Sequence, residues 1–173
     1  MEIRHIEGQA DVRGLIRAHG LAWREAYDGL LPSEVLQNQP INPTEEDVRK
    51  WQKGLQENQE GVLVAVDNEE VVRGFVDIRW GDSETKEFVG DDEADLKAIY
   101  VEPNWWGKGI GTALLERGLE IIPESVDVVR LEMFTENDIA SRFYESRGFR
   151  QTSVGEYDIA GHSYPTSIYT LQM

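Results

Sequence analysis

A glycine-rich run between Trp106 and Gly111 is the part of this sequence best suited to chemistry. It reads Trp-Gly-Lys-Gly-Ile-Gly and precedes a stretch with a helical pattern. Glycine accepts backbone angles that other residues avoid and lets a ligand approach the main chain. N–H groups at a helix start converge on an anion, helped by the helix dipole, and Lys108 adds a positive charge. The run predicts a phosphate-binding turn, although a tight turn with close packing would give the same pattern.

The glycine spacing argues against two common nucleotide-binding loops. Dinucleotide-binding proteins carry Gly-x-Gly-x-x-Gly in a first βαβ unit, and P-loops end in Gly-Lys-Ser/Thr. This run has neither pattern, and it comes late in the chain. A protein with either of these nucleotide-binding loops is therefore disfavoured.

Two motifs together resemble the GNAT family of N-acetyltransferases. The first is Val101-x-Pro103 followed by the glycine run, which is similar to the acetyl-CoA signature of the family. The second is the segment 137–149, Asn-Asp-Ile-Ala-Ser-Arg-Phe-Tyr-Glu-Ser-Arg-Gly-Phe, at the expected separation. The resemblance covers residues 60–171 well and the N-terminal part more loosely. It implies an α/β fold of the α+β type, with one mixed, mostly antiparallel sheet flanked by helices, as a single domain over residues 1–173.

The resemblance also implies acetyl-CoA as the acyl donor. No metal is expected, because the sequence has no cysteine and its three histidines lack metal-ligand spacing. Main-chain groups of Ile99, Tyr100 and Val101 would face the pantetheine arm, and an N–H of Ile99 or Tyr100 would polarise the thioester carbonyl. Asn137 could cap the following helix, hydrogen-bond acetyl-CoA, or do both. The pyrophosphate would be held by the turn residues Gly107, Lys108, Gly109, Ile110, Gly111 and Thr112.

Trp106 departs from the family pattern, which has Gln or Arg at this position to help organise the turn. An indole brings no charge. Lys108 and the backbone amides would then carry more of the binding, or the affinity for CoA would be lower.

Tyr144 is the candidate general acid. Acyl transfer from a thioester to an amine needs a polarised carbonyl, a neutral amine, alignment and a proton for the departing thiolate. The resemblance implies that the Tyr144 hydroxyl faces the CoA sulfur. The alternative is an ordinary half-buried tyrosine that packs through its ring. The sequence has no cysteine, so an acyl-cysteine intermediate is excluded and direct attack by the amine is expected.

The general base has two candidates. Asp95, counted back from the glycines, matches a place where some relatives carry a basic carboxylate, and it could deprotonate the substrate ammonium through water. It could equally be a solvated acid in the acidic run 91–95. Glu132 on the next expected strand is the other candidate.

The elements that must position these residues follow from hydrophobic periodicity and turn signals. Strands are expected at residues 2–6, 62–66, 71–80, 96–101, 128–134, 149–157 and 164–171. Helices are expected at 11–27, 44–56, 109–122 and 137–147, with a short one opening at 30–33. The second and third strands form a hairpin. The strands at 96–101 and 128–134, joined by a helix, form a βαβ unit with parallel pairing.

Composition limits the class of protein further. A length of 173 residues with 40% hydrophobic content fits one domain with a sizeable core. The histidines His5, His19 and His162 lack metal-ligand spacing and are expected on the surface or in loops. No apolar run approaches the roughly 18 residues of a membrane span, and the N-terminus lacks the apolar core of a signal peptide. A cytoplasmic protein with no membrane partner is expected.

The net charge of −16 disfavours nucleic acid as a partner. One explanation of this charge is a preference for a cationic substrate. The other is adaptation to a salty, halophilic cytoplasm, and we favour it because acidic residues occur all along the chain.

The expected function is transfer of an acetyl group from acetyl-CoA to a primary amine of a small molecule or a peptide. Trp23, Tyr27 and Trp80 could line the acceptor pocket, although aromatic residues at such positions more often belong to the core. The alternative function is a non-catalytic acyl-CoA sensor, which Trp106 slightly favours. A homodimer is compatible with such a domain.

Overall fold

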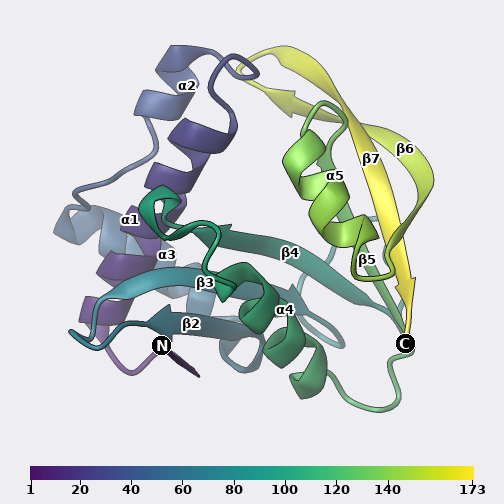
Figure 1. The fold of residues 1–173 in the computed structure, drawn as a ribbon, viewed down its shortest axis with the longest axis horizontal. Helices are drawn as coiled ribbons and strands as arrows, with labels where there is room; N and C mark the ends of the chain where they lie inside the picture. Colours follow the sequence, from purple (N-terminus) through teal and green to yellow (C-terminus); the bar gives the residue numbers. More distant parts are fainter.

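The computed structural model describes residues 1–173 and shows a seven-stranded sheet with helices on both faces (Figure 1). The strands are β1 (Glu2–Arg4), β2 (Val62–Val66), β3 (Val72–Arg79), β4 (Ala94–Val101), β5 (Val128–Phe134), β6 (Arg150–Ile159) and β7 (His162–Gln172). The helices are α1 (Gln9–Ala26), α2 (Ser33–Gln37), α3 (Glu45–Gln56), α4 (Ile110–Ile121) and α5 (Asp138–Glu145), with short 3-10 turns η1 (Gln59–Gly61) and η2 (Pro103–Trp105).

The strand order is β1-β2-β3-β4-β5-β7-β6, and only the β4–β5 pair is parallel. The predicted fold class, the β2–β3 hairpin and the parallel βαβ unit are confirmed. The last hairpin is longer than predicted, because its strands continue to a two-residue turn at Ala160 (φ 51°) and Gly161 (φ 83°). Positive φ at both central residues matches the right-handed twist of the flanking strands.

The β4–β5 pairing covers only two positions, Ala94 with Val129 and Asp95 with Arg130. Beyond them the strands diverge, and the gap widens toward the end of β4 (Figure 1). β4 also carries a bulge at Lys97, because its neighbours in the strand pair with consecutive residues of β3. A bulge bends its strand, and this one lies where β4 leaves β5.

The core has two main parts, one on each face of the sheet. Leu15 and Ile16 of α1 belong to a buried cluster with β2 and β3 residues. Leu114 and Leu115 of α4 belong to the other, which includes Leu131 of β5. Burying a side chain of this size contributes about 1.5–3 kcal/mol. The cluster around Leu114 also contains residues of β2, β3, β4 and β7, so it joins the two parts of the sheet across the gap.

Candidate active site

The turn after β4 presents free backbone N–H groups at the start of α4. Gly107 (φ 77°) and Gly109 (φ 83°) adopt left-handed conformations that favour glycine. The first backbone bond of α4 runs from the Ala113 N–H to the Gly109 carbonyl, at 3.0 Å. The N–H groups of residues 107–112 have no acceptor within the protein. Together with the helix dipole they form a site suited to an anion.

The indole of Trp106 fixes this turn to the strand before it. Its Nε1 donates to the Val101 carbonyl at 2.7 Å, while the side chain stays 39% exposed. Where the family pattern has a polar or charged residue, this chain therefore has a hydrogen bond that holds the turn in place.

Two cations lie beside the turn. Lys108 is exposed, with its Nζ 5.9 Å from the centre of the Trp105 ring. Arg147, from the segment between α5 and β6, donates to Thr112 Oγ1 and lies 4.5 Å from the Phe143 ring centre. Sequence reasoning missed Arg147, although it lies within the second motif. Its position adds a positive charge at the start of α4.

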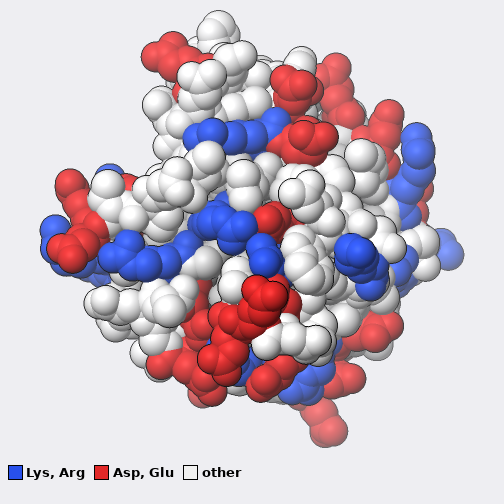
Figure 2. Space-filling view, turned by 60° about the vertical axis from the view of Figure 1, so that its left-hand side comes forward, with Lys and Arg blue, Asp and Glu red and all other residues white.

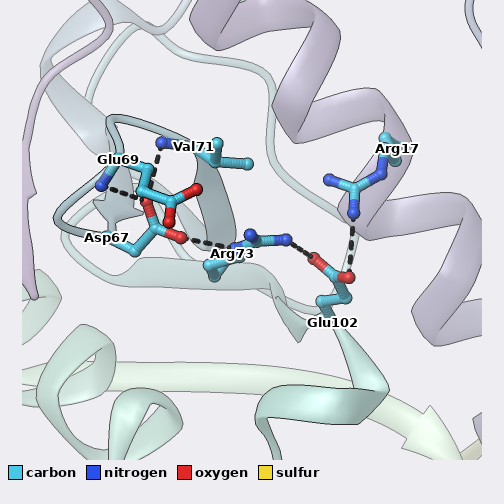
Figure 3. A network of polar contacts seen from close by, with 6 residues as sticks. All are labelled: Arg17, Asp67, Glu69, Val71, Arg73 and Glu102. Carbon is cyan, nitrogen blue, oxygen red and sulfur yellow. Dashed lines mark hydrogen bonds and ion pairs between the residues drawn. The ribbon is translucent and has the colours of Figure 1, made fainter.

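An ion-pair network anchors the beginning of the turn (Figure 3). The carboxylate of Glu102, 5% exposed, accepts hydrogen bonds from Arg17 of α1 and Arg73 of β3, each at 2.9 Å. Arg73 also donates to Asp67 at 2.8 Å and lies 4.9 Å from the Trp105 ring centre. Asp67 in turn accepts two backbone N–H groups of the β2–β3 turn (Figure 3). The network connects α1, β3 and the start of the glycine turn.

Basic side chains are gathered locally despite the acidic net charge. Figure 2, which turns the left-hand side of Figure 1 forward, shows Lys and Arg in a band across the middle of that face. Acidic side chains lie mainly below the band and at the edges of the view. The middle of this face therefore carries more positive charge than the −16 of the whole chain suggests.

A cleft of about 700 Å³ occupies the gap between β4 and β5. Successive side chains of a strand point to opposite faces of the sheet, so β5 contributes residues to the cleft on both faces of the sheet. Leu131 and Met133 pack in the cluster that includes α4 residues, whereas Phe134 packs with Tyr27. Glu132 shares the face of Phe134 and lines the same cleft. The cleft therefore joins the α5 side of the sheet to the α1 side.

The cleft brings together many, but not all, of the predicted residues. Its lining includes Ile99, Tyr100, Asn137, Tyr144, Glu132, Trp23 and Tyr27. Trp80, Asp95, Val101 and the glycine turn lie outside this lining.

Tyr144 reaches the cleft from α5. Its ring lies 5.1 Å from that of Phe143 and 5.4 Å from that of Phe149, and its hydroxyl has no protein partner. Burial, with a smaller effect of Tyr100, raises the pKa of Tyr144 well above its ordinary value. The phenol is therefore protonated at neutral pH and available to donate.

Asn137 caps α5. Its side-chain oxygen accepts a hydrogen bond from the Ala140 N–H at 3.1 Å. The predicted capping role is confirmed. A contact with acetyl-CoA, which its place in the cleft allows, stays a prediction.

The two candidate bases lie in different surroundings. Asp95 is 2% exposed, accepts the Lys86 N–H at 3.2 Å through one oxygen and has no partner on the other. Burial raises its pKa, so it is not a solvated acid. Glu132 lines the cleft, where it pairs with Lys86 Nζ at 2.6 Å and accepts from Thr166 Oγ1 at 2.6 Å.

His19 corrects the expectation of a surface or loop histidine. It lies in α1, is 9% exposed, and its ring centre is 5.0 Å from Trp23, 4.9 Å from Trp51 and 5.2 Å from Tyr100. Its Nδ1 is buried without a partner, and the residue lines the cleft. Burial, and then the nearby charge of Lys97, lowers the pKa of His19 to about 4. The imidazole is therefore neutral at pH 7.

No group of three or more His, Asp or Glu side chains is arranged to hold a metal ion. None of the helices combines the length and hydrophobicity that a membrane crossing requires.

The model of the acetyltransferase (GNAT) family matches residues 22–149. An uncharacterized N-acetyltransferase of Methanocaldococcus jannaschii is 32% identical over 108 residues, which is 61% of this chain. The peptidyl-lysine N-acetyltransferase YjaB of Escherichia coli is 33% identical over 70 residues, or 40% of this chain. The alignments span 45% of the length of each of these two relatives.

Solved structures show the same fold. PaiA N-acetyltransferase from Thermoplasma acidophilum, in complex with coenzyme A, superposes with a TM-score of 0.74 at 19% identity, over 99% of this chain and 98% of that one. The ribosomal-protein-alanine N-acetyltransferase of Brucella melitensis gives a TM-score of 0.71 at 22% identity over the full length of both chains. At such identities the likeness is one of fold.

Proposed function

The chain belongs to the acetyltransferase (GNAT) family, and we propose that it transfers an acetyl group from acetyl-CoA to a primary amine. One observation carries the proposal. A cleft occupies the gap between β4 and β5, with the protonated Tyr144 phenol and the Glu132 carboxylate both in its lining. Acyl transfer needs an acid for the leaving thiolate and a base for the incoming ammonium, and these two groups can supply both.

Residues of this chain are suited to hold the acyl donor. The free N–H groups of residues 107–112 would take the pyrophosphate, with Lys108 and Arg147 supplying charge. The main chain of Ile99, Tyr100 and Val101 lies on the part of β4 that has no β5 neighbour. It can therefore offer hydrogen bonds to the pantetheine arm, and an N–H there would stabilise the developing oxyanion.

Glu132 is our first choice as the base. It would accept a proton from the acceptor ammonium, and the neutral amine would then attack the thioester carbon directly. Tyr144 would protonate the departing thiolate. Asp95, which is buried within the parallel pairing and outside the cleft lining, is the second candidate, acting through water.

Peptide amines come first among the acceptors to test. Two similar proteins are named a peptidyl-lysine and a ribosomal-protein-alanine N-acetyltransferase. Trp23, Tyr27 and His19 give the α1 side of the cleft an aromatic wall, which can contact the apolar part of an acceptor.

Thiol release from acetyl-CoA tests the proposal. The panel should hold peptides with a free N-terminal alanine, peptides with an internal lysine, a polyamine and a small monoamine. We expect release that depends on the amine. Calorimetry with acetyl-CoA, CoA and ATP should accompany it. Binding of acetyl-CoA without release on any amine would favour the sensor, and binding of ATP alone would contradict both readings.

A further inference from the structure

Lys86 has a position that no other lysine of the chain shares. Its Nζ lies 2.6 Å from Glu132 Oε1, inside the cleft. Lys50, Lys53, Lys97 and Lys108 form no ion pair. Lys86 is therefore the one primary amine of this protein that a cleft carboxylate holds.

The Glu132 carboxylate lies where β4 and β5 separate. Arg130, two positions earlier on the strand, is the last residue of β5 that pairs with β4. The part of β4 that does not pair with β5, including Ala98 and Ile99, lines the same cleft as Glu132 and Tyr144. An amine bound to Glu132 consequently shares one cleft with the main chain that would polarise the thioester and with the acid that would protonate the thiolate.

The surroundings of Glu132 are built to receive an ammonium group. The side chain is only 10% exposed, and its other oxygen accepts the Thr166 hydroxyl at 2.6 Å. Position 155 is glycine, and a Cβ there would lie 3.0 Å from Thr166 Oγ1 and 3.4 Å from Glu132 Oε2. A side chain at this position would thus crowd the carboxylate. A buried carboxylate needs a charged partner, and Lys86 supplies one.

Lys86 lies in the loop between β3 and β4, whereas Glu132 lies on strand β5 of the sheet. Its backbone N–H is tied to Asp95 at 3.2 Å, and its Nζ lies 5.1 Å from the Tyr157 ring centre. The side chain is 35% exposed, so rotation about its own bonds can carry the ammonium toward solvent while the Asp95 hydrogen bond holds the backbone. The ammonium can therefore leave Glu132 and return without refolding of the segment.

We propose that Lys86 is a site of self-acetylation, which occupies the ammonium position of the acceptor and takes an acetyl group from acetyl-CoA bound to the same molecule. The inference rests on the proposed function, because it uses the same acyl donor, base and acid. An external amine must displace Lys86 from Glu132 before it can react.

The step balances as an ordinary aminolysis. Glu132 takes one proton from the Lys86 ammonium, and the neutral Nζ attacks the thioester carbon to form the N–C bond. The C–S bond breaks, and the thiolate takes a proton from Tyr144. The acylated nitrogen gives up its second proton, which restores the phenol, while the proton on Glu132 passes to solvent. The products are acetyl-lysine and free CoA.

The experiment incubates the full-length protein with acetyl-CoA and no added amine. Peptide mass spectrometry then follows the acetyl occupancy of each lysine with time. We expect Lys86 to react on the order of a hundredfold faster than Lys97, the size of effect that a positioned base provides. Lys97 is the matched control because it lines the same cleft without a carboxylate partner. The rate constant should not depend on protein concentration.

Three variants sharpen the test. Glu132→Gln should slow labelling of Lys86 toward the rate of Lys97, and Lys86→Arg should remove that label without moving it elsewhere. Lys97→Arg should leave the Lys86 label intact. Equal labelling of Lys86 and Lys97, or labelling that Glu132→Gln does not slow, would overturn the inference. Acetylation of external amines without any on Lys86 would refute self-acetylation alone, whereas absence of both despite acetyl-CoA binding would refute the proposed function as well.

Discussion

A single oxygen atom separates Tyr144 from the phenylalanine that would pack in its place against Phe143 and Phe149. The variant Tyr144→Phe therefore keeps the ring contacts and removes only the proton donor. We expect kcat to fall on the order of a hundredfold, with little change in the Kd of acetyl-CoA. Steady-state kinetics and calorimetry measure the two quantities.

Tyr169→Phe is the control, because its hydroxyl donates to Glu145 at 3.0 Å and the residue does not line the cleft. It should keep its kcat. An unchanged kcat in Tyr144→Phe would remove this hydroxyl from the mechanism.

The buried His19 predicts a specific pH dependence of stability. Its pKa is about 4 in the folded protein and about 6.5 in the unfolded chain, so the unfolded chain binds the extra proton between these values. The stabilisation is complete above pH 6.5 and is lost as the pH falls toward 4, by about 3 kcal/mol. Urea unfolding of the wild type and of His19→Gln at several pH values measures this.

Other groups also titrate in this range, among them Glu93, whose pKa the hydrogen-bonded Arg130 lowers. These groups contribute equally to the unfolding free energy of the wild type and of His19→Gln, so their contributions cancel when the two free energies are subtracted. The gap in unfolding free energy between wild type and variant should shrink by about 3 kcal/mol between pH 7 and pH 4. A constant gap would show that His19 titrates normally in the folded protein.

Some cleft-lining residues were predictable from the family resemblance: Tyr144 and Asn137 lie in the second motif, and Ile99 lies on the strand before the first. Lys86 and His19 were missed. Lys86 meets a partner 46 positions away, and His19 is buried by rings from other elements. Contacts of this kind join residues that are far apart in the sequence, and local sequence patterns carry no information about them.

At the scale of elements, the start of α4 depends on Gly109. Its φ of 83° is strained for any residue with a Cβ, although a Cβ there would meet no atom within 4 Å. Gly109→Ala should lower the unfolding free energy by about 1–2 kcal/mol through this strain alone. It should also weaken acetyl-CoA binding, because the N–H groups of the turn would shift. Thermal unfolding and calorimetry test both effects.

Gly111→Ala is the matched control for stability. Its backbone is helical, and a Cβ would lie 3.7 Å from Phe143, an ordinary contact. Its unfolding temperature should equal that of the wild type or be slightly higher. Equal destabilisation by both substitutions would mean that the left-handed turn is not what matters.

The order and type of the elements were predictable because hydrophobic periods of two and 3.6 residues are local properties. The separation of β4 from β5 was not. The bulge at Lys97 and the two-position pairing arise from register and packing between strands that lie far apart in sequence. The feature that creates the cleft is therefore the part of the fold that periodicity cannot predict.

For the whole molecule, the charge of −16 arises from 33 acidic and 17 basic residues. Self-repulsion opposes the compact state, and salt screens it. We expect Tm to rise between low and molar KCl, by about 2–4 °C for each kcal/mol gained. Sucrose is the control, because it stabilises by exclusion without screening charge. Equal Tm at low and molar KCl would contradict a halophilic adaptation.

The narrow β4–β5 pairing also has a mechanical consequence. The N-terminus belongs to the half of the sheet formed by β1–β4 and the C-terminus to the half formed by β5–β7, on opposite sides of the gap (Figure 1). A stretching force applied to the two ends acts across a seam that has only two paired positions and is otherwise closed by side-chain packing. The molecule should yield there first, with each half still intact. A ligand bound across the seam would raise the force needed to separate the two halves. A single-molecule pulling experiment would therefore detect bound ligand as a higher rupture force.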